Sequence, residues 1–156
     1  MEIKPSEDGV TNINVYSKGS TELGRLLSNF AYTPFRHPTY GRFASVEAFW
    51  YWLSLDKKYD QIKPLFGYKC KQAAKELIAN GAVRVSIDDF KEQIKEAITL
   101  KLQQHPGIVK LLKDTKLPLT HYYVYGKIVN DPSKYKVLFP KDSEWILDHI
   151  ETFRNS

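Results

Sequence analysis

A short, strongly apolar segment from Ser45 to Leu53 constrains the fold of this chain more than any other stretch. Ser45 has the side chain of a good helix N-cap. Apolar residues then follow on one face at helical spacing, namely Val46, Phe49, Trp50 and Leu53. The predicted helix is apolar around most of its circumference, which is typical of a helix at the centre of a fold.

Helical periodicity recurs later in the chain. We predict helices over 67–80, from Ser86 to the His105-Pro106 break, over 107–113 and over 142–153. The residues expected to be buried are Ala73, Ala74, Leu77 and Ile78 in the first of these, Ile87, Phe90, Ile94, Ala97, Ile98 and Leu102 in the second, and Trp145, Ile146, Ile150 and Phe153 in the last.

Strand patterns are short and lie towards both ends of the chain. They cover 13–16 and 119–125, whereas 24–43 carries two prolines and no helical period and is predicted to be an ordered loop with short extended pieces. The sequence therefore predicts an α+β fold that is predominantly α-helical, in a single domain over 1–156 whose residues 1–12 are poorly ordered.

Composition excludes several classes of protein. The single Cys70 excludes an intramolecular disulfide, and four scattered histidines are too few for a metal cluster without carboxylates. The longest apolar run, Ala48–Leu53, is far shorter than the roughly 20 residues of a membrane span. The acidic, polar N-terminus does not look like a secretory signal. We expect a cytoplasmic protein that needs no metal or cofactor and does not bind membranes.

The net charge of +5 favours a polyanionic partner, either nucleic acid or a phosphate-bearing small molecule. Glu47 is the one charged residue between Arg42 and Asp56. A carboxylate in the first turn of a helix is commonly there to stabilise the helix N-terminus. The same position also suits catalysis, because a carboxylate held ionised there, beside aromatic residues such as Trp50, can stabilise the oxocarbenium-like cation formed when a glycosidic bond breaks.

Other polar residues have two interpretations each. Ser28 and Asn29 either cap a turn or bind ribose hydroxyls and pyrophosphate. Lys18 is either an ordinary surface lysine or, if desolvated, a nucleophile or a phosphate contact. His121 is either structural or a proton-transfer group.

Taken together, these segments resemble the NADAR family, also called YbiA-like, from Val15 to Glu151. The combination of Ser-Asn-Phe and Ser-x-Glu at this spacing is the most specific part of the resemblance. The sequence of residues 18–30 looks closest to family members encoded by large tailed phages. The matching segments are Tyr16-Ser17-Lys18, Leu27-Ser28-Asn29-Phe30, Pro34-Phe35, Tyr40–Phe43, Ser45-Val46-Glu47, Lys101–His105, Leu111–Thr115 and Tyr125-Gly126.

The resemblance implies N-glycosidase chemistry in a YbiA-like domain. Some family members remove ADP-ribose from guanine in nucleic acid and so reverse the action of DNA-modifying toxins, whereas others hydrolyse phosphoribosyl-amine intermediates of riboflavin synthesis. By this resemblance Glu47 is the catalytic carboxylate and Lys18 a nucleophile or phosphate contact. The residues that it assigns to the substrate pocket are Ser28, Asn29 and Phe30 on one wall and Tyr125 and Gly126 on the other. We expect Trp50 and His121 to contact the substrate as well.

The family usually has an acidic cluster just before its Trp-Gly pair, whereas this chain has His121-Tyr122-Tyr123-Val124. His121 is therefore expected to take over proton transfer. The leading prediction is a hydrolase that acts on ADP-ribosylated guanine in DNA, in the host cytoplasm if a phage encodes it. Hydrolysis of a small phosphorylated riboside, and non-catalytic binding of ADP-ribose or nucleic acid, are the alternatives.

Overall fold

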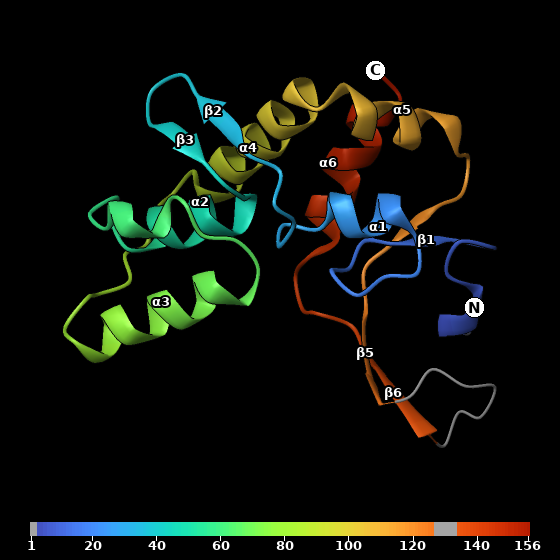
Figure 1. The fold of residues 1–156 in the computed structure, drawn as a ribbon, viewed down its shortest axis with the longest axis horizontal. Coiled ribbons are helices and arrows are strands. Elements are labelled where there is room, and N and C mark those ends of the chain that lie inside the picture. Colours follow the sequence, from blue (N-terminus) through green and yellow to red (C-terminus); the bar gives the residue numbers. More distant parts are fainter. Residues whose placement is uncertain (1–2, 127–133) are drawn as a thin grey trace. The chain divides into compact units, whose positions relative to one another are not determined.

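The computed structural model describes residues 3–126 and 134–156 and confirms a helix-dominated α+β fold (Figure 1). The helices are α1 (Glu22–Leu27), α2 (Val46–Ser54), α3 (Tyr68–Ala79), α4 (Phe90–Gln104), α5 (Pro106–Asp114) and α6 (Glu144–Arg154). The strands are β1 (Ile13–Asn14), β2 (Phe35–His37), β3 (Gly41–Phe43), β4 (Leu119–Thr120), β5 (Tyr123–Gly126) and β6 (Tyr135–Leu138). In this described part of the chain, no helix combines the length and apolarity that crossing a bilayer requires.

The chain divides into two compact units, which are described separately. The central unit is Asn29–Val109, and the terminal unit combines Met1–Ser28 with Lys110–Ser156. The strands pair within units: β2–β3 is an antiparallel hairpin of the central unit, whereas parallel β1–β4 and antiparallel β5–β6 belong to the terminal unit.

Helix α2 is the centre of the central unit, as its apolar sequence predicts. It packs against α3, α4 and β3, and Figure 1 shows it between the β2–β3 hairpin and α3. The Ser45 hydroxyl caps α2 by accepting a hydrogen bond from the Ala48 amide at 3.0 Å. The Phe49 ring is fully buried and meets the Phe43 ring edge-on at 5.0 Å. Trp50, which was predicted on the buried face, is only half-buried.

The predicted boundaries of α3 are nearly correct, but its predicted buried face is partly wrong. The helix begins after Gly67, whose φ is 63°, and stops before Gly81, whose φ is 106°. Both angles lie in the left-handed region that favours glycine. Cys70 and Ala74 are the buried side chains of α3, whereas Ile78 is 37% exposed. Packing against α2 decides which side of α3 is buried, and the sequence of α3 alone does not show it.

Helix α4 begins at Phe90, not at Ser86 as predicted. Asp89 occupies the N-cap position, so the expected capping box at Ser86 does not form. The predicted apolar stripe is correct for Ile94, Ala97, Ile98 and Leu102, which are all buried. Lys101 is buried beside them, with 1% of its surface exposed.

In the terminal unit, a buried asparagine extends the pairing of β1 with β4. The strands are in register at Ile13–Leu119 and Asn14–Thr120. Beyond this register the Asn14 side chain takes the place of a strand residue, since its Nδ2 donates to the Tyr122 carbonyl at 2.9 Å and its Oδ1 accepts from the Tyr122 amide at 3.0 Å. Asn14 therefore joins segments that lie more than a hundred residues apart in the sequence.

One expectation for the first part of the chain was wrong. Helix α1 overlaps the start of the loop predicted over 24–43, and its N-cap is Thr21, whose hydroxyl accepts from the Gly24 amide at 2.9 Å. Within the segment predicted to be poorly ordered, Asp8 makes hydrogen bonds to two backbone amides. The Asp8 carboxylate accepts from the Asn14 amide at 2.9 Å and from the Ser20 amide at 2.8 Å, and Asp8 is 8% exposed. Residues 1–2 lie outside the described part of the chain.

Candidate functional site

The residues predicted to form a site are distributed over both units. Those of the central unit are Asn29, Phe30, Glu47 and Trp50. Those of the terminal unit are Lys18, Ser28, His121, Tyr125 and Gly126.

Glu47 lies in the first turn of α2, where three chain segments of the central unit meet. Its amide donates to the Asn29 carbonyl at 2.9 Å, and the Ser45 hydroxyl donates to the Leu65 carbonyl at 2.9 Å. Gly67, which precedes α3, donates its amide to the Phe30 carbonyl at 2.9 Å. These bonds connect Asn29-Phe30 and the segment before α3 to the N-terminus of α2.

The carboxyl group of Glu47 is half-buried and has no hydrogen bond or ion pair with another residue described by the structure. Burial raises its pKa from 4.5 to about 7, and the charge of Lys71 on α3 only partly opposes this. The sequence predicted a carboxylate held ionised by the helix N-terminus, whereas the raised pKa leaves Glu47 only partly ionised at neutral pH. The free energy lost by removing the charge from water is larger than the stabilisation that the helix N-terminus gives to that charge. The pKa of Glu47 therefore lies close to neutral pH.

The raised pKa predicts how stability changes with pH. Because the folded-state pKa lies above the unfolded value, the penalty for ionising Glu47 is absent below about pH 4.5 and complete above about pH 7. Glu47→Gln should therefore be more stable than the unchanged chain by up to about 3 kcal/mol near pH 8, and the difference should vanish near pH 4. Urea unfolding at several pH values measures it. Glu76→Gln on the exposed face of α3 is the matched control, and an equal gain there would contradict the prediction.

Trp50 and Phe30 contribute differently to this region. The Trp50 ring meets the Phe90 ring edge-on at 5.0 Å, so one side of it packs against α4. Phe30 is half-buried, and its carbonyl accepts the hydrogen bond from the Gly67 amide. Lys71 was missed at the sequence level, because no local pattern brings residue 71 near residue 47. The buried Cys70 thiol lies 3.8 Å from the Ser45 hydroxyl, and burial raises its pKa to about 11, so it is not a nucleophile at neutral pH.

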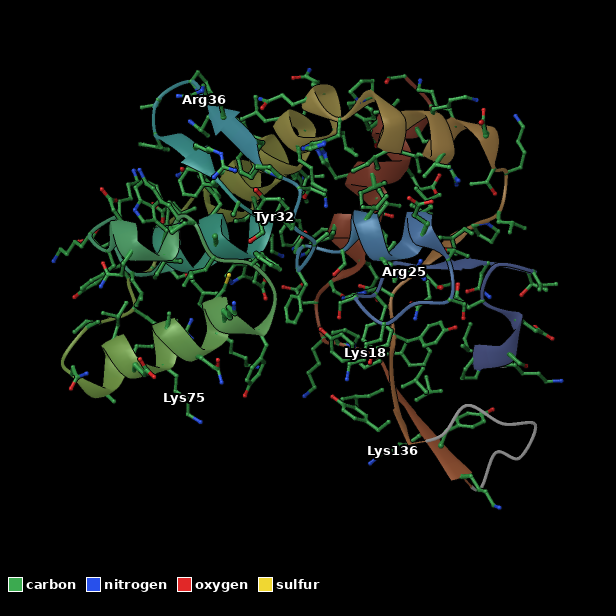
Figure 2. All side chains as sticks on the ribbon, in the orientation of Figure 1. Lys18, Arg25, Tyr32, Arg36, Lys75 and Lys136 are labelled. Carbon is green, nitrogen blue, oxygen red and sulfur yellow. The ribbon has the colours of Figure 1, made fainter. Side chains whose placement is uncertain are left out.

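Lys18 is exposed on the turn between β1 and α1 (Figure 2). Lys18 is therefore not desolvated, and contact with phosphate is the interpretation that its exposure favours. The turn itself is well held: the Gly19 amide donates to the Tyr16 carbonyl at 2.9 Å, and Asp8 accepts from the Ser20 amide. Asp8, which the sequence did not single out, thus orients the backbone that carries Lys18.

Ser28, Tyr125 and Gly126 occupy ends of elements in the terminal unit. Ser28 is the buried C-cap residue of α1. Tyr125 is 55% exposed on β5, opposite Lys136 of β6. Gly126 has a φ of 97°, and a Cβ there would stand 2.6 Å from the Lys134 carbonyl oxygen, so only glycine fits this end of the hairpin.

His121 is a neutral imidazole with one nitrogen committed. Its Nδ1 lies 2.6 Å from the Val15 carbonyl, which only accepts, so Nδ1 carries the proton and Nε2 holds a lone pair. Burial lowers the pKa of His121, and this hydrogen bond only partly opposes the shift. Because of its burial, the ring is neutral at pH 7. In this form His121 accepts a proton through Nε2 and does not supply one.

Among residues 3–126 and 134–156, no three His, Cys, Asp or Glu side chains converge in a way that would hold a metal ion. No family model, no curated protein and no solved structure matches this chain.

Proposed function

We propose that this protein is an N-glycosidase that removes ADP-ribose from guanine bases of nucleic acid and acts in the cytoplasm. The observation that carries the proposal is the Glu47 carboxyl, which is half-buried at a helix N-terminus, has a pKa of about 7 and makes no bond to another described side chain. A carboxyl group that only stabilises a helix N-terminus does not require a pKa near neutral pH, whereas a group that exchanges protons during catalysis does.

In the proposed reaction the bond between the ribose anomeric carbon and the guanine nitrogen breaks, and its electron pair leaves with the base. The ionised form of Glu47 stabilises the positive charge that develops on the sugar. Water then adds to the anomeric carbon and gives a proton to Glu47, which can return it to the departing guanine. Both protonation states are therefore used, and a pKa near 7 populates both at neutral pH.

The other assignments rest on the resemblance to the NADAR family. Ser28, Asn29 and Phe30 would bind the ribose and its phosphates, and Tyr125 and Gly126 would contact the substrate from β5. Exposed Lys18 would bind a phosphate oxygen. No metal or cofactor takes part in this scheme.

The decisive experiment is mass analysis of an oligonucleotide that carries ADP-ribose on one guanine, after incubation with the pure protein. We expect free ADP-ribose and an oligonucleotide of unmodified mass. Tight binding of ADP-ribose without product would show a non-catalytic reader and contradict the proposal. Faster turnover of a free phosphoribosyl-amine than of the oligonucleotide would assign the chemistry to small ribosides instead.

Substitution of His121 tests its part in proton transfer. His121→Asn keeps a side-chain N–H near the position of Nδ1, so the bond to the Val15 carbonyl can persist while the titratable Nε2 is lost. If Nε2 accepts a proton during turnover, both His121→Asn and His121→Ala should lose activity by about 100-fold between about pH 6 and pH 8. A fully active His121→Asn combined with an inactive His121→Ala would instead show a structural role.

A further inference from the structure

Aromatic side chains of the central unit are exposed near the segments that position Glu47. Tyr32 is 54% exposed, Phe66 41% and Tyr68 60%. The rings of Tyr32 and Phe66 lie 5.1 Å apart, at an angle of 59°. Large aromatic residues gathered at a surface commonly mark a binding site.

These aromatic residues stand on a rigid backbone. The Gly67 amide is bonded to the Phe30 carbonyl at 2.9 Å, and the Thr33 amide is bonded to the Ala44 carbonyl at 3.1 Å. The Ala44 amide is bonded in turn to the Lys63 carbonyl at 2.8 Å. The segments 30–33 and 63–67 are therefore fixed to each other, which lowers the entropy lost when a ligand binds to their side chains.

Positive charge surrounds the rings. Arg42 donates to the Tyr32 hydroxyl at 3.1 Å, and the Lys69 ammonium lies 5.8 Å from the centre of the Phe66 ring. Segments 30–44 and 63–71 together contain five lysines and arginines and no aspartate or glutamate. We call Tyr32, Arg42, Phe66, Tyr68 and Lys69 the aromatic–basic patch.

We propose that the aromatic–basic patch binds a single-stranded polynucleotide, with unpaired bases stacked on Tyr32 and Phe66 and backbone phosphates on Arg42 and Lys69. Exposed rings interleaved with cations are the combination by which proteins hold single strands without reading their sequence. A duplex keeps its bases stacked on one another and leaves these rings unused. Neither segment itself contains an acidic residue that would repel a phosphate backbone.

This binding needs neither ADP-ribose nor Glu47, so it is independent of the proposed hydrolysis. Glu47→Gln should bind an unmodified strand as the unchanged protein does. Loss of hydrolysis with intact strand binding, or the reverse, separates the two proposals.

The test is the fluorescence anisotropy of a labelled oligothymidylate of about 20 nucleotides, which contains no guanine and no ADP-ribose. We expect saturable binding, and a loss of affinity of about fivefold or more for both Tyr32→Ala and Phe66→Ala. Phe66→Tyr keeps the ring and should restore binding. Lys69→Glu should weaken binding and make the dependence of log K on log salt shallower by about 0.7 or more.

Two exposed residues outside the patch provide matched controls. Lys75 is exposed on the same helix as Lys69 and separated from it by roughly 120° around the helix axis, and Figure 2 shows its side chain pointing away from α3. Phe139 of the terminal unit is 57% exposed. Lys75→Ala and Phe139→Ala should bind normally. Three results would overturn the proposal. The first is no binding of the strand, which is expected if the patch binds another protein. The second is equal binding by patch variants and controls, and the third is tighter binding of a duplex of equal length.

Discussion

Replacing Glu47 with glutamine is expected to slow release of ADP-ribose from guanine by at least about 100-fold, the cost of losing a preorganised electrostatic stabiliser. Glutamine nearly keeps the shape of the side chain, yet it can neither carry a negative charge nor accept a proton. Because Glu47 is the only side chain to which the proposed scheme gives both tasks, the maximal rate should fall, while the affinity for ADP-ribose should change little. Single-turnover measurement of ADP-ribose release, with calorimetric binding of free ADP-ribose, separates these two quantities.

Glu76→Gln is the matched control for charge, because Glu76 is exposed on α3. It should leave the rate unchanged. The rate of the unchanged protein should also follow a group that titrates near the pKa of about 7 assigned to Glu47. A Glu47→Gln protein that folds and releases ADP-ribose at the normal rate would refute the catalytic assignment, whatever its stability.

Gly24→Ala should destabilise the protein by about 3 kcal/mol or more, through overpacking against backbone. A Cβ at residue 24 would stand 2.2 Å from the Asn14 carbonyl oxygen and 2.9 Å from the Thr21 hydroxyl. The first contact is with main chain, which cannot rotate away as a flexible side chain does. Relief therefore requires α1 to move off β1. Thermal unfolding followed by circular dichroism should show a fall in Tm of roughly 10 °C, given the usual scaling for a chain of this size.

Gly107→Ala, also in a helix, is expected to change the stability of the protein in the opposite direction. Gly107 lies in α5, and a Cβ there would meet nothing within 4 Å. Alanine has the higher helix propensity, so this variant should be neutral or more stable by up to about 1 kcal/mol. Equal Tm values for Gly24→Ala and the unchanged protein would show that the approach of α1 to Asn14 is looser than the structure describes.

The elements that were predicted correctly are those whose signals are local. Ser45 and the apolar run after it specify α2, and the left-handed Gly81 marks the end of α3. Helix α1 was missed because it has only six residues and contains Gly24, so it lacks a long periodic pattern. Its N-cap at Thr21 is the one local signal that could have revealed it.

The candidate site shows the same limit. The position of Glu47 in the first turn of α2 was predictable, but its protonation was not. Helix-terminus electrostatics, which are local, predict an ionised carboxylate, whereas burial depends on neighbours such as α3 that the sequence does not place beside residue 47. Asp8 and Lys71 were missed for the same reason, since their effects on Ser20 and Glu47 act across 12 and 24 positions of chain.

The pairing of β1 with β4 also sets an order of events during synthesis. Ile13 and Asn14 are made before the central unit, whereas their partners Leu119 and Thr120 are made more than a hundred residues later. The central unit, by contrast, is one continuous stretch. We therefore expect residues 29–109 to acquire structure on the ribosome first, while Ile13 and Asn14 stay unpaired until Leu119 and Thr120 have been made.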